Sequence, residues 1–148
     1  MRVVEAMTRD ARLAKPDQSI AEAAKLMAEC DCGVLPVEEN DRLVGMITDR
    51  DIVIRGLAQG KTADAKVRDV MSKDVKYCFE EDDVDDVARN MGDLQIRRLP
   101  VLNKDKRLTG IVSLGDIAGT DEIDVAAEAL SSISESASKH VSAGLRPH

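Results

Sequence analysis

Two short polar motifs carry residue types that can bind a sugar phosphate. One runs from Thr48 to Asp51 (Thr-Asp-Arg-Asp) and the other from Ser113 to Asp116 (Ser-Leu-Gly-Asp). Each lies where an apolar stretch gives way to a helical pattern, so a hydroxyl and the first N–H groups of a helix would face an anion. The carboxylate three residues after the hydroxyl can accept hydrogen bonds from both hydroxyls of a ribose. The motifs therefore indicate phosphate and ribose recognition.

The same spacing also has a purely structural interpretation. Ser or Thr followed three residues later by an acid is close to a capping box, which explains an isolated motif without any ligand. Two copies in one chain, each near basic residues, favour ligand binding. Arg50 belongs to the first motif, and Arg97 and Arg98 lie ahead of the second. These two arginines also fit a solvated strand face, so both interpretations stay open.

Other chemistry has fewer candidates. Both histidines, His140 and His148, lie near the C-terminal end, which leaves the main body without a base for Ser-His-Asp or Cys-His catalysis. The three cysteines, Cys30, Cys32 and Cys78, lack the paired spacing of a zinc site, so we expect buried or idle thiols. We therefore predict neither an enzyme nor a metal site.

Composition argues against two classes of partner. The 148 residues include 28 acidic and 21 basic side chains, and the net charge of −7 opposes binding to nucleic acid and anionic membranes. Tyr77 and Phe79 are the only aromatic residues, too few for the stacking platforms of RNA and single-strand binders. The sequence shows no apolar leader or long apolar run, and its odd set of cysteines is typical of reduced thiols. We expect a soluble, cytoplasmic protein.

The chain repeats itself. Met7 returns as Met71, a shift of 64 residues, and the tripeptide Leu-Pro-Val at 35–37 returns at 99–101. Repeat 2 then has one extra residue in a presumed loop, where a true duplication tolerates an insertion. Beyond this insertion the first polar motif aligns with the second. The predicted organisation is repeat 1 (1–58), a linker (59–66), repeat 2 (67–120) and a helical or frayed tail (121–148).

Each repeat predicts the same succession of elements. Apolar residues at helical spacing mark an amphipathic helix that begins near residue 20 and, in repeat 2, near residue 84. A strand containing Leu-Pro-Val, a polar turn and a second strand follow. A second helix is expected from about Asp49 to Leu57, and from about Leu114 onward in repeat 2. The predicted fold class is α/β (α+β), built from two tandem β-α-β-β-α repeats.

The tail carries a further apolar stripe with a spacing of four residues. Its members are Val125, Ala129, Ile133, Ala137 and Val141. This stripe predicts a helix that packs on the body or on a second chain. Because the tail is rich in serine, which is a poor residue for the interior of a helix, a frayed end is the alternative.

Taken together, these repeated motifs resemble the CBS domain. The shared pattern is Met-Thr/Ser, an amphipathic helix, Leu-Pro-Val, Leu-x-Gly and Thr/Ser-x-x-Asp-Ile, and it spans about residues 1–120. The doublet resembles a Bateman module, as in small stand-alone bacterial CBS-pair proteins. The resemblance implies two repeats packed sheet against sheet about a pseudo-two-fold axis. It also implies two clefts that take AMP, ADP, ATP or another adenosyl compound, such as NAD(H) or S-adenosylmethionine.

The resemblance also implies roles for individual residues. Thr48 with Asp51, and Ser113 with Asp116, would hold phosphate and ribose. The segments around each Leu-Pro-Val would line the base and the phosphate, so the full candidate set adds Arg50, Cys32, Gly33, Val34, Pro36, Ile96, Arg97, Arg98 and Pro100. Arg97 of repeat 2 corresponds to Gly33 of repeat 1, and Arg50 of repeat 1 corresponds to Gly115 of repeat 2. We therefore expect two clefts that are not equivalent.

We therefore expect a regulatory module that senses an adenosyl compound, with no required cofactor, an adenine nucleotide as ligand and an unidentified effector as a further partner. A homodimer is expected because the second helices carry the apolar residues Ile52, Val53, Leu57 and Ile117. The alternatives are a structural or stress-associated dimer with empty clefts, a sensor of NAD(H) or S-adenosylmethionine, and an unrecognised enzyme.

Overall fold

The structure is a computed structural model that describes residues 1–119 and 124–134. It divides into two compact units. The first-repeat unit contains Asp10–Lys76 with Lys106–Leu108, and the second-repeat unit contains Met1–Arg9, Tyr77–Asp105 and the described residues from Thr109 onward. The N-terminal nine residues thus belong with the second-repeat unit, where Thr8 N–H donates to Ile111 O at 2.8 Å. The predicted packing of the repeats about a pseudo-two-fold axis stays a prediction.

In the first-repeat unit a capped helix is followed by an antiparallel strand pair. Helix α2 (Ile20–Cys30) begins near residue 20, as the sequence predicted. At its start Ser19 Oγ accepts from Glu22 N–H at 3.1 Å, and the helix buries Ile20, Ala23 and Met27. Strands β1 (Val34–Glu39) and β2 (Arg42–Thr48) form a two-stranded sheet with a register irregularity after Val37. The predicted order of helix, strand and strand is confirmed.

The expected first strand of repeat 1 is reduced to a single bridge, between Ala14 and Val37. In repeat 2 the residue equivalent to Ala14 is Cys78, which begins strand β3 (Cys78–Phe79). Directly after this strand, Glu80 N–H donates to Leu102 O at 2.9 Å. The residue equivalent to Glu80 at the shift of 64 is Pro16, which has no N–H group to donate. Proline therefore explains the shorter strand.

The predicted second helix of repeat 1 is present but is not a regular α-helix. Its main part, η1 (Asp51–Gly56), is of the π type, and a short 3-10 turn, η2 (Leu57–Gln59), follows it. Gly60 ends the segment with a φ of 82°, a left-handed conformation that glycine adopts easily. The unit continues through η3 (Val67–Asp69), whose Val67 is buried in the same core as Ile20, Leu35 and Ile47.

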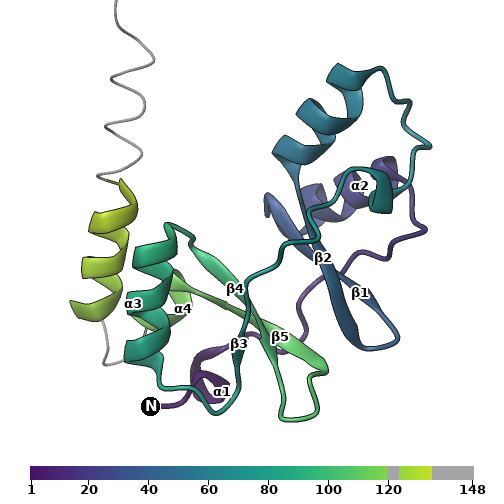
Figure 1. Ribbon diagram of the computed structural model, residues 1–148. Helices are drawn as coiled ribbons and strands as arrows, with labels where there is room; N and C mark the ends of the chain where they lie inside the picture. Colours follow the sequence, from purple (N-terminus) through teal and green to yellow (C-terminus); the bar gives the residue numbers. More distant parts are fainter. Residues whose placement is uncertain (120–123, 135–148) are drawn as a thin grey trace, which may run out of the picture. The chain divides into compact units, whose positions relative to one another are not determined.

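The second-repeat unit has a three-stranded sheet in the order β3-β4-β5. Its other elements are α1 (Val3–Ala6), α3 (Val84–Leu94), β4 (Arg98–Leu102), β5 (Leu108–Ser113) and α4 (Leu114–Ala118). Figure 1 shows α3 and a further helix, 124–134, side by side. A separate core fills this unit, with Val84, Met91, Leu99 and Ile117 among its buried residues. The predicted fold class, mixed α and β, is confirmed.

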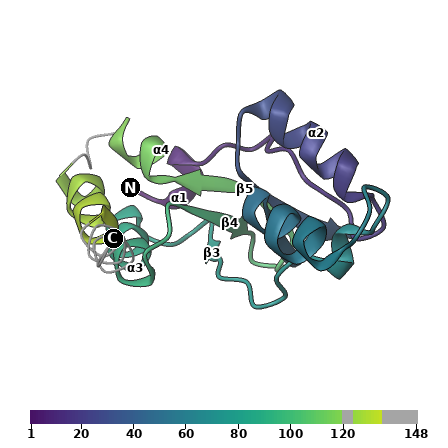
Figure 2. The same cartoon turned by 90° about the horizontal axis from the view of Figure 1, so that it is seen from above.

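Helix 124–134 packs on the second-repeat unit. The prediction of a helix that packs on the body is therefore confirmed for this part of the tail. Ala129 and Ile133 of the predicted stripe are buried in the core of this unit, and Val125 packs against it. The helix approaches α3 at Gly92, where an added Cβ would lie 3.2 Å from the Cα of Ala129. Figure 2 shows the same neighbours from above. The rest of the stripe, Ala137 and Val141, lies outside the described residues.

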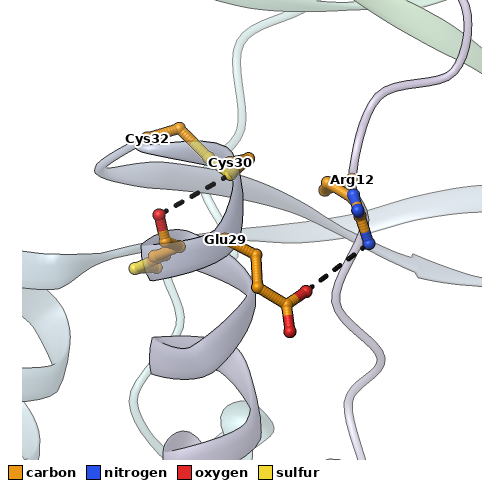
Figure 3. The surroundings of a disulfide bond; sticks show 5 residues. Arg12, Glu29, Cys30 and Cys32 are labelled. Atoms are coloured by element: carbon orange, nitrogen blue, oxygen red, sulfur yellow. Dashed lines mark hydrogen bonds and ion pairs between the residues drawn. A yellow bond between two sulfur atoms is a disulfide. The ribbon is translucent and has the colours of Figure 1, made fainter.

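Two of the three cysteines differ from our expectation. Cys30 and Cys32 form a disulfide, so the prediction of idle thiols is wrong for this pair. The cause is Asp31, which ends α2 with a φ of 52° and turns the chain so that the two cysteines meet, with Cα atoms 5.3 Å apart. Figure 3 shows this disulfide beside the ion pair of Arg12 and Glu29. Cys78 is a free, buried thiol.

Along residues 1–119 and 124–134, no helix combines the length and apolar character needed to cross a membrane. The location of the protein in the cell stays a prediction.

Candidate functional site

The second polar motif forms a reciprocal cap. Ser113 ends β5 and its Oγ accepts from Asp116 N–H at 3.0 Å, while Asp116 Oδ2 accepts from Ser113 N–H at 3.0 Å. The motif therefore acts as a helix cap, as its structural interpretation requires. The cap uses Oδ2 of Asp116, so it does not require Oδ1.

The first polar motif repeats this geometry. Thr48 N–H donates to Asp51 Oδ2 at 2.9 Å, and Asp51 N–H donates to Thr48 Oγ1 at 3.0 Å. Here the second carboxylate oxygen already has a cation nearby, because Asp51 Oδ1 lies 3.9 Å from an Arg55 guanidinium nitrogen. The two motifs are thus equivalent as caps but differ in what surrounds the remaining oxygen.

A pocket of about 430 Å³ lies beside the second motif, entirely within the second-repeat unit. Its polar members are Arg97, Arg98 and Ser113, so the structure brings together three of the predicted site residues. The remaining lining is apolar and comes from Leu114, Gly115, Ala118, Ala126, Ala127 and Leu130. The volume falls within the range of about 300–1,000 Å³ that is usual for small-molecule sites.

Backbone hydrogen bonds fix the position of the arginine pair. Arg97 O accepts from Leu114 N–H at 3.0 Å, which joins the residue before β4 to the first residue of α4. Ile96 N–H donates to Met91 O at 3.0 Å, and the Ile96 side chain packs on the core. Pro100 is buried within β4. Ile96 and Pro100 therefore support the arginine pair and are not among the residues that line the pocket.

The equivalent part of repeat 1 is built differently. Gly33 O accepts from Asp49 N–H at 2.9 Å, and an added Cβ on Gly33 would lie 3.0 Å from Asp49 Oδ2. A side chain at this position therefore requires the carboxylate of Asp49 to move. Val34 pairs with Thr48 in the sheet, and Cys32 N–H donates to Met27 O at 3.0 Å. Pro36 is buried within β1.

These differences change the charge of the two half-sites. Arg97 and Arg98 occupy the positions of Gly33 and Val34, and Leu114 occupies the position of Asp49. The first-repeat half-site therefore has a carboxylate where its counterpart is apolar, and it lacks both guanidinium groups at the strand. Arg50 stays the predicted basic residue of this half-site, Arg55 lies near its Asp51, and Gly115 is the counterpart of Arg50. An anion is better matched to the second-repeat pocket than to the first-repeat half-site.

Sequence reasoning missed the apolar lining of the pocket. The spacing of four along the tail found the helix, but the stripe it marked faces the core. Among the pocket-lining residues, Ala127 and Leu130 lie on an adjoining side of that helix, and Ala126 is also buried in the core. Ala118 of α4 was missed for a similar reason, since no local pattern distinguishes a small residue beside a cavity from one at a surface.

The described residues offer little else for catalysis or metal binding. Across ranges 1–119 and 124–134 no group of three or more His, Cys, Asp or Glu side chains is arranged to hold a metal ion. Burial, with a smaller effect of the Asp82 charge, raises the pKa of the Cys78 thiol to about 12. This cysteine therefore stays protonated at neutral pH and is a poor nucleophile.

Comparison with known proteins gives a consistent result. The family model described as "CBS domain" matches residues 3–56 and again residues 67–121. An uncharacterized protein of Bacillus subtilis, YlbB, is 39% identical over 137 residues, which cover 90% of this chain and 92% of YlbB.

Two solved structures show the same fold with ligands. The structure of CBSX2 in complex with AMP has a TM-score of 0.70 and 29% identity, covering 80% of this chain and 93% of that one. The CBS domain pair of MJ0100, in complex with 5′-methylthioadenosine and S-adenosyl-L-methionine, has a TM-score of 0.69 and 32% identity, covering 80% and 94%. Because the family match covers both halves of the internal repeat, the chain belongs to the CBS-domain family and carries two CBS domains in tandem.

Proposed function

We propose that this protein is a regulatory module that binds an adenosyl compound, and that its principal site is the second-repeat pocket. One observation carries the proposal: a cavity of about 430 Å³ has two arginines and a serine among an otherwise apolar lining. An adenine nucleotide has matching parts, since it joins an apolar base to a ribose and an anionic phosphate. No catalytic step is part of this proposal.

Each part of the ligand has a candidate partner. Arg97 and Arg98 suit the phosphate, because guanidinium groups form strong bidentate hydrogen bonds with phosphate oxygens. Ser113 lines the pocket, and its hydroxyl can donate a proton to the same group. Asp116 is not among the residues that line the pocket, but it belongs to the same motif as Ser113, and we propose that it accepts from the ribose through Oδ1, the oxygen that its cap does not require. The apolar lining suits the base.

The arginine pair also favours one kind of adenosyl compound over another. Relatives of this fold have been solved with AMP and with S-adenosyl-L-methionine and 5′-methylthioadenosine. Methylthioadenosine has no anionic group, and S-adenosylmethionine offers the arginines one carboxylate together with a positively charged sulfonium and ammonium, whereas a nucleotide offers a phosphate without either cation. We expect AMP, ADP or ATP to bind more tightly than either of them.

Calorimetric titration of the purified protein with AMP and with adenosine tests this proposal. AMP should bind, and adenosine should bind at least about tenfold more weakly, because a lost pair of charge-assisted hydrogen bonds is worth 1.4 kcal/mol or more. Replacing Arg97 and Arg98 by Gln should remove this difference. Equal affinity for AMP and adenosine in the parent protein would show that the arginines do not bind phosphate.

We also propose a homodimer, through the second helix of repeat 1. Val53 and Leu57 are 51% and 58% exposed, so they leave apolar surface that a second copy could cover. Ile117, another residue of the predicted apolar set, is fully buried within its own unit and cannot contribute. Light scattering should give the mass of a dimer at micromolar concentration, and replacing Val53 and Leu57 by Lys should give a monomer.

A further inference from the structure

Three residues of the second-repeat pocket come from outside the two CBS domains. The family match ends at residue 121, whereas Ala126, Ala127 and Leu130 belong to helix 124–134. This chain therefore supplies part of its pocket from a segment that follows the domain pair. Figure 1 shows this helix in yellow-green beside α3.

The helix is anchored on one side and open on the other. Ala129 and Ile133 are buried against the core, and Gly92 of α3 permits a close backbone approach at Ala129. Leu130, on the pocket side, remains 41% exposed, and Ala127 is exposed as well. Covering an exposed leucine with the apolar part of a ligand is favourable, because it removes apolar surface from water.

Small residues on α4 leave room for the pocket. Gly115 and Ala118 line it, and their equivalents in repeat 1 are Arg50 and Val53, two much larger side chains. Larger side chains at these two positions would project toward the space that the ligand and helix 124–134 share. The small residues and the extra helix thus occur together in the second-repeat unit.

We propose that helix 124–134 is a specificity-determining wall of the second-repeat ligand site, in which Ala127 and Leu130 contact the apolar part of the bound ligand and limit its size. This inference rests on the proposed function, since it assigns a role in the same site. Ligand binding and docking of the helix then stabilise each other, because the ligand contacts both the helix and the CBS domain.

Tryptophan fluorescence tests contact with the ligand directly, because the chain contains no tryptophan. Leu130→Trp places the single tryptophan on the pocket wall. Ser131→Trp is the matched control, one residue further along the same helix, exposed and outside the pocket lining. Titration with AMP should change the emission of Leu130→Trp to saturation and leave that of Ser131→Trp unchanged. An unchanged emission of Leu130→Trp while calorimetry shows AMP binding to the same variant overturns the inference.

A second pair of variants tests the limit on ligand size. Ala127→Trp fills the pocket and should weaken AMP binding by at least about tenfold in calorimetry, whereas Ser131→Trp should stay within about twofold of the parent. Should Ala127→Trp fail to fold by circular dichroism, Ala127→Leu replaces it, with a smaller loss of about threefold to tenfold.

The outcomes separate this inference from the function on which it rests. AMP binding that is the same in the parent and in the folded Ala127 variants overturns the role of the helix and leaves the proposed function standing. Absence of binding by AMP, ATP and S-adenosylmethionine to the parent protein overturns the proposed function, and the role of the helix is refuted with it.

Discussion

Replacing Asp116 separates its cap from the ribose recognition that we propose, because the cap to α4 uses only one of the two carboxylate oxygens. Asp116→Ala removes the bond from Ser113 N–H, which is 3.0 Å long, and a lost cap costs about 0.5–2 kcal/mol. Asp116→Asn keeps an oxygen for the cap and loses the charged acceptor. Both variants should therefore lose the stabilisation that AMP gives the folded protein. Only the alanine variant should lose much stability without ligand.

The ligand effect is large enough to measure against the cap. A ligand that binds only the folded state adds about 2.7 kcal/mol at a concentration 100 times its dissociation constant. For a chain of this size that corresponds to a rise of about 5–11 °C in Tm. Thermal unfolding with and without AMP should show this rise for the parent and little of it for either Asp116 variant.

Asp51→Ala provides the matched control, because Asp51 makes the same cap in the first-repeat half-site. It should lower the stability without ligand by a similar amount and keep the AMP effect of the second-repeat pocket. If both Asp116 variants retain the full rise in Tm with AMP, this carboxylate is only a cap, and our assignment of ribose recognition is wrong.

Three further predictions concern stability. Gly92→Leu should displace helix 124–134 and lower the free energy of unfolding by about 1–3 kcal/mol in urea titrations, because an added Cβ would lie 3.2 Å from a backbone atom of that helix. The Lys15 ammonium, and then the N–H group of Asp41, hold the pKa of buried Glu38 below its usual value of 4.5, so its stabilisation is complete above pH 4.5 and is lost as pH falls through the lower folded pKa. Glu38→Gln should cost about 1 kcal/mol at pH 7, since Lys15 is largely exposed, and the difference from the parent should shrink in urea titrations toward pH 3. Reduction of the Cys30–Cys32 disulfide by dithiothreitol should lower the free energy of unfolding by no more than about 1.6 kcal/mol, because the bond closes a loop of only three residues; a larger loss would show that the reduced loop changes conformation.

The sequence alone predicts the main elements because their signals are local. The amphipathic spacing after Ser19 and Asp83 predicts both long helices, and the structure confirms α2 and α3 at those positions. The internal repeat then allows each half to be checked against the other. The polar motifs were found for the same reason, since they recur where a strand ends and a helix begins.

Other features depend on contacts that local patterns do not contain. The disulfide requires the left-handed conformation of Asp31, and spacing alone did not indicate it. The pocket depends on how helix 124–134 packs beside α3 and α4, which brings Ala127 and Leu130 near the arginine pair. The shortened first strand was in principle readable from Pro16, because proline cannot donate the hydrogen bond that Glu80 makes.

The central claim is that an adenine nucleotide binds in the second-repeat pocket, and a crystal structure of the protein with AMP tests it most directly. We predict electron density for AMP in this pocket, with the phosphate beside Arg97 and Arg98 and the base against helix 124–134. Density for AMP only at another place, or an empty pocket at an AMP concentration that saturates the protein in solution, would contradict the account.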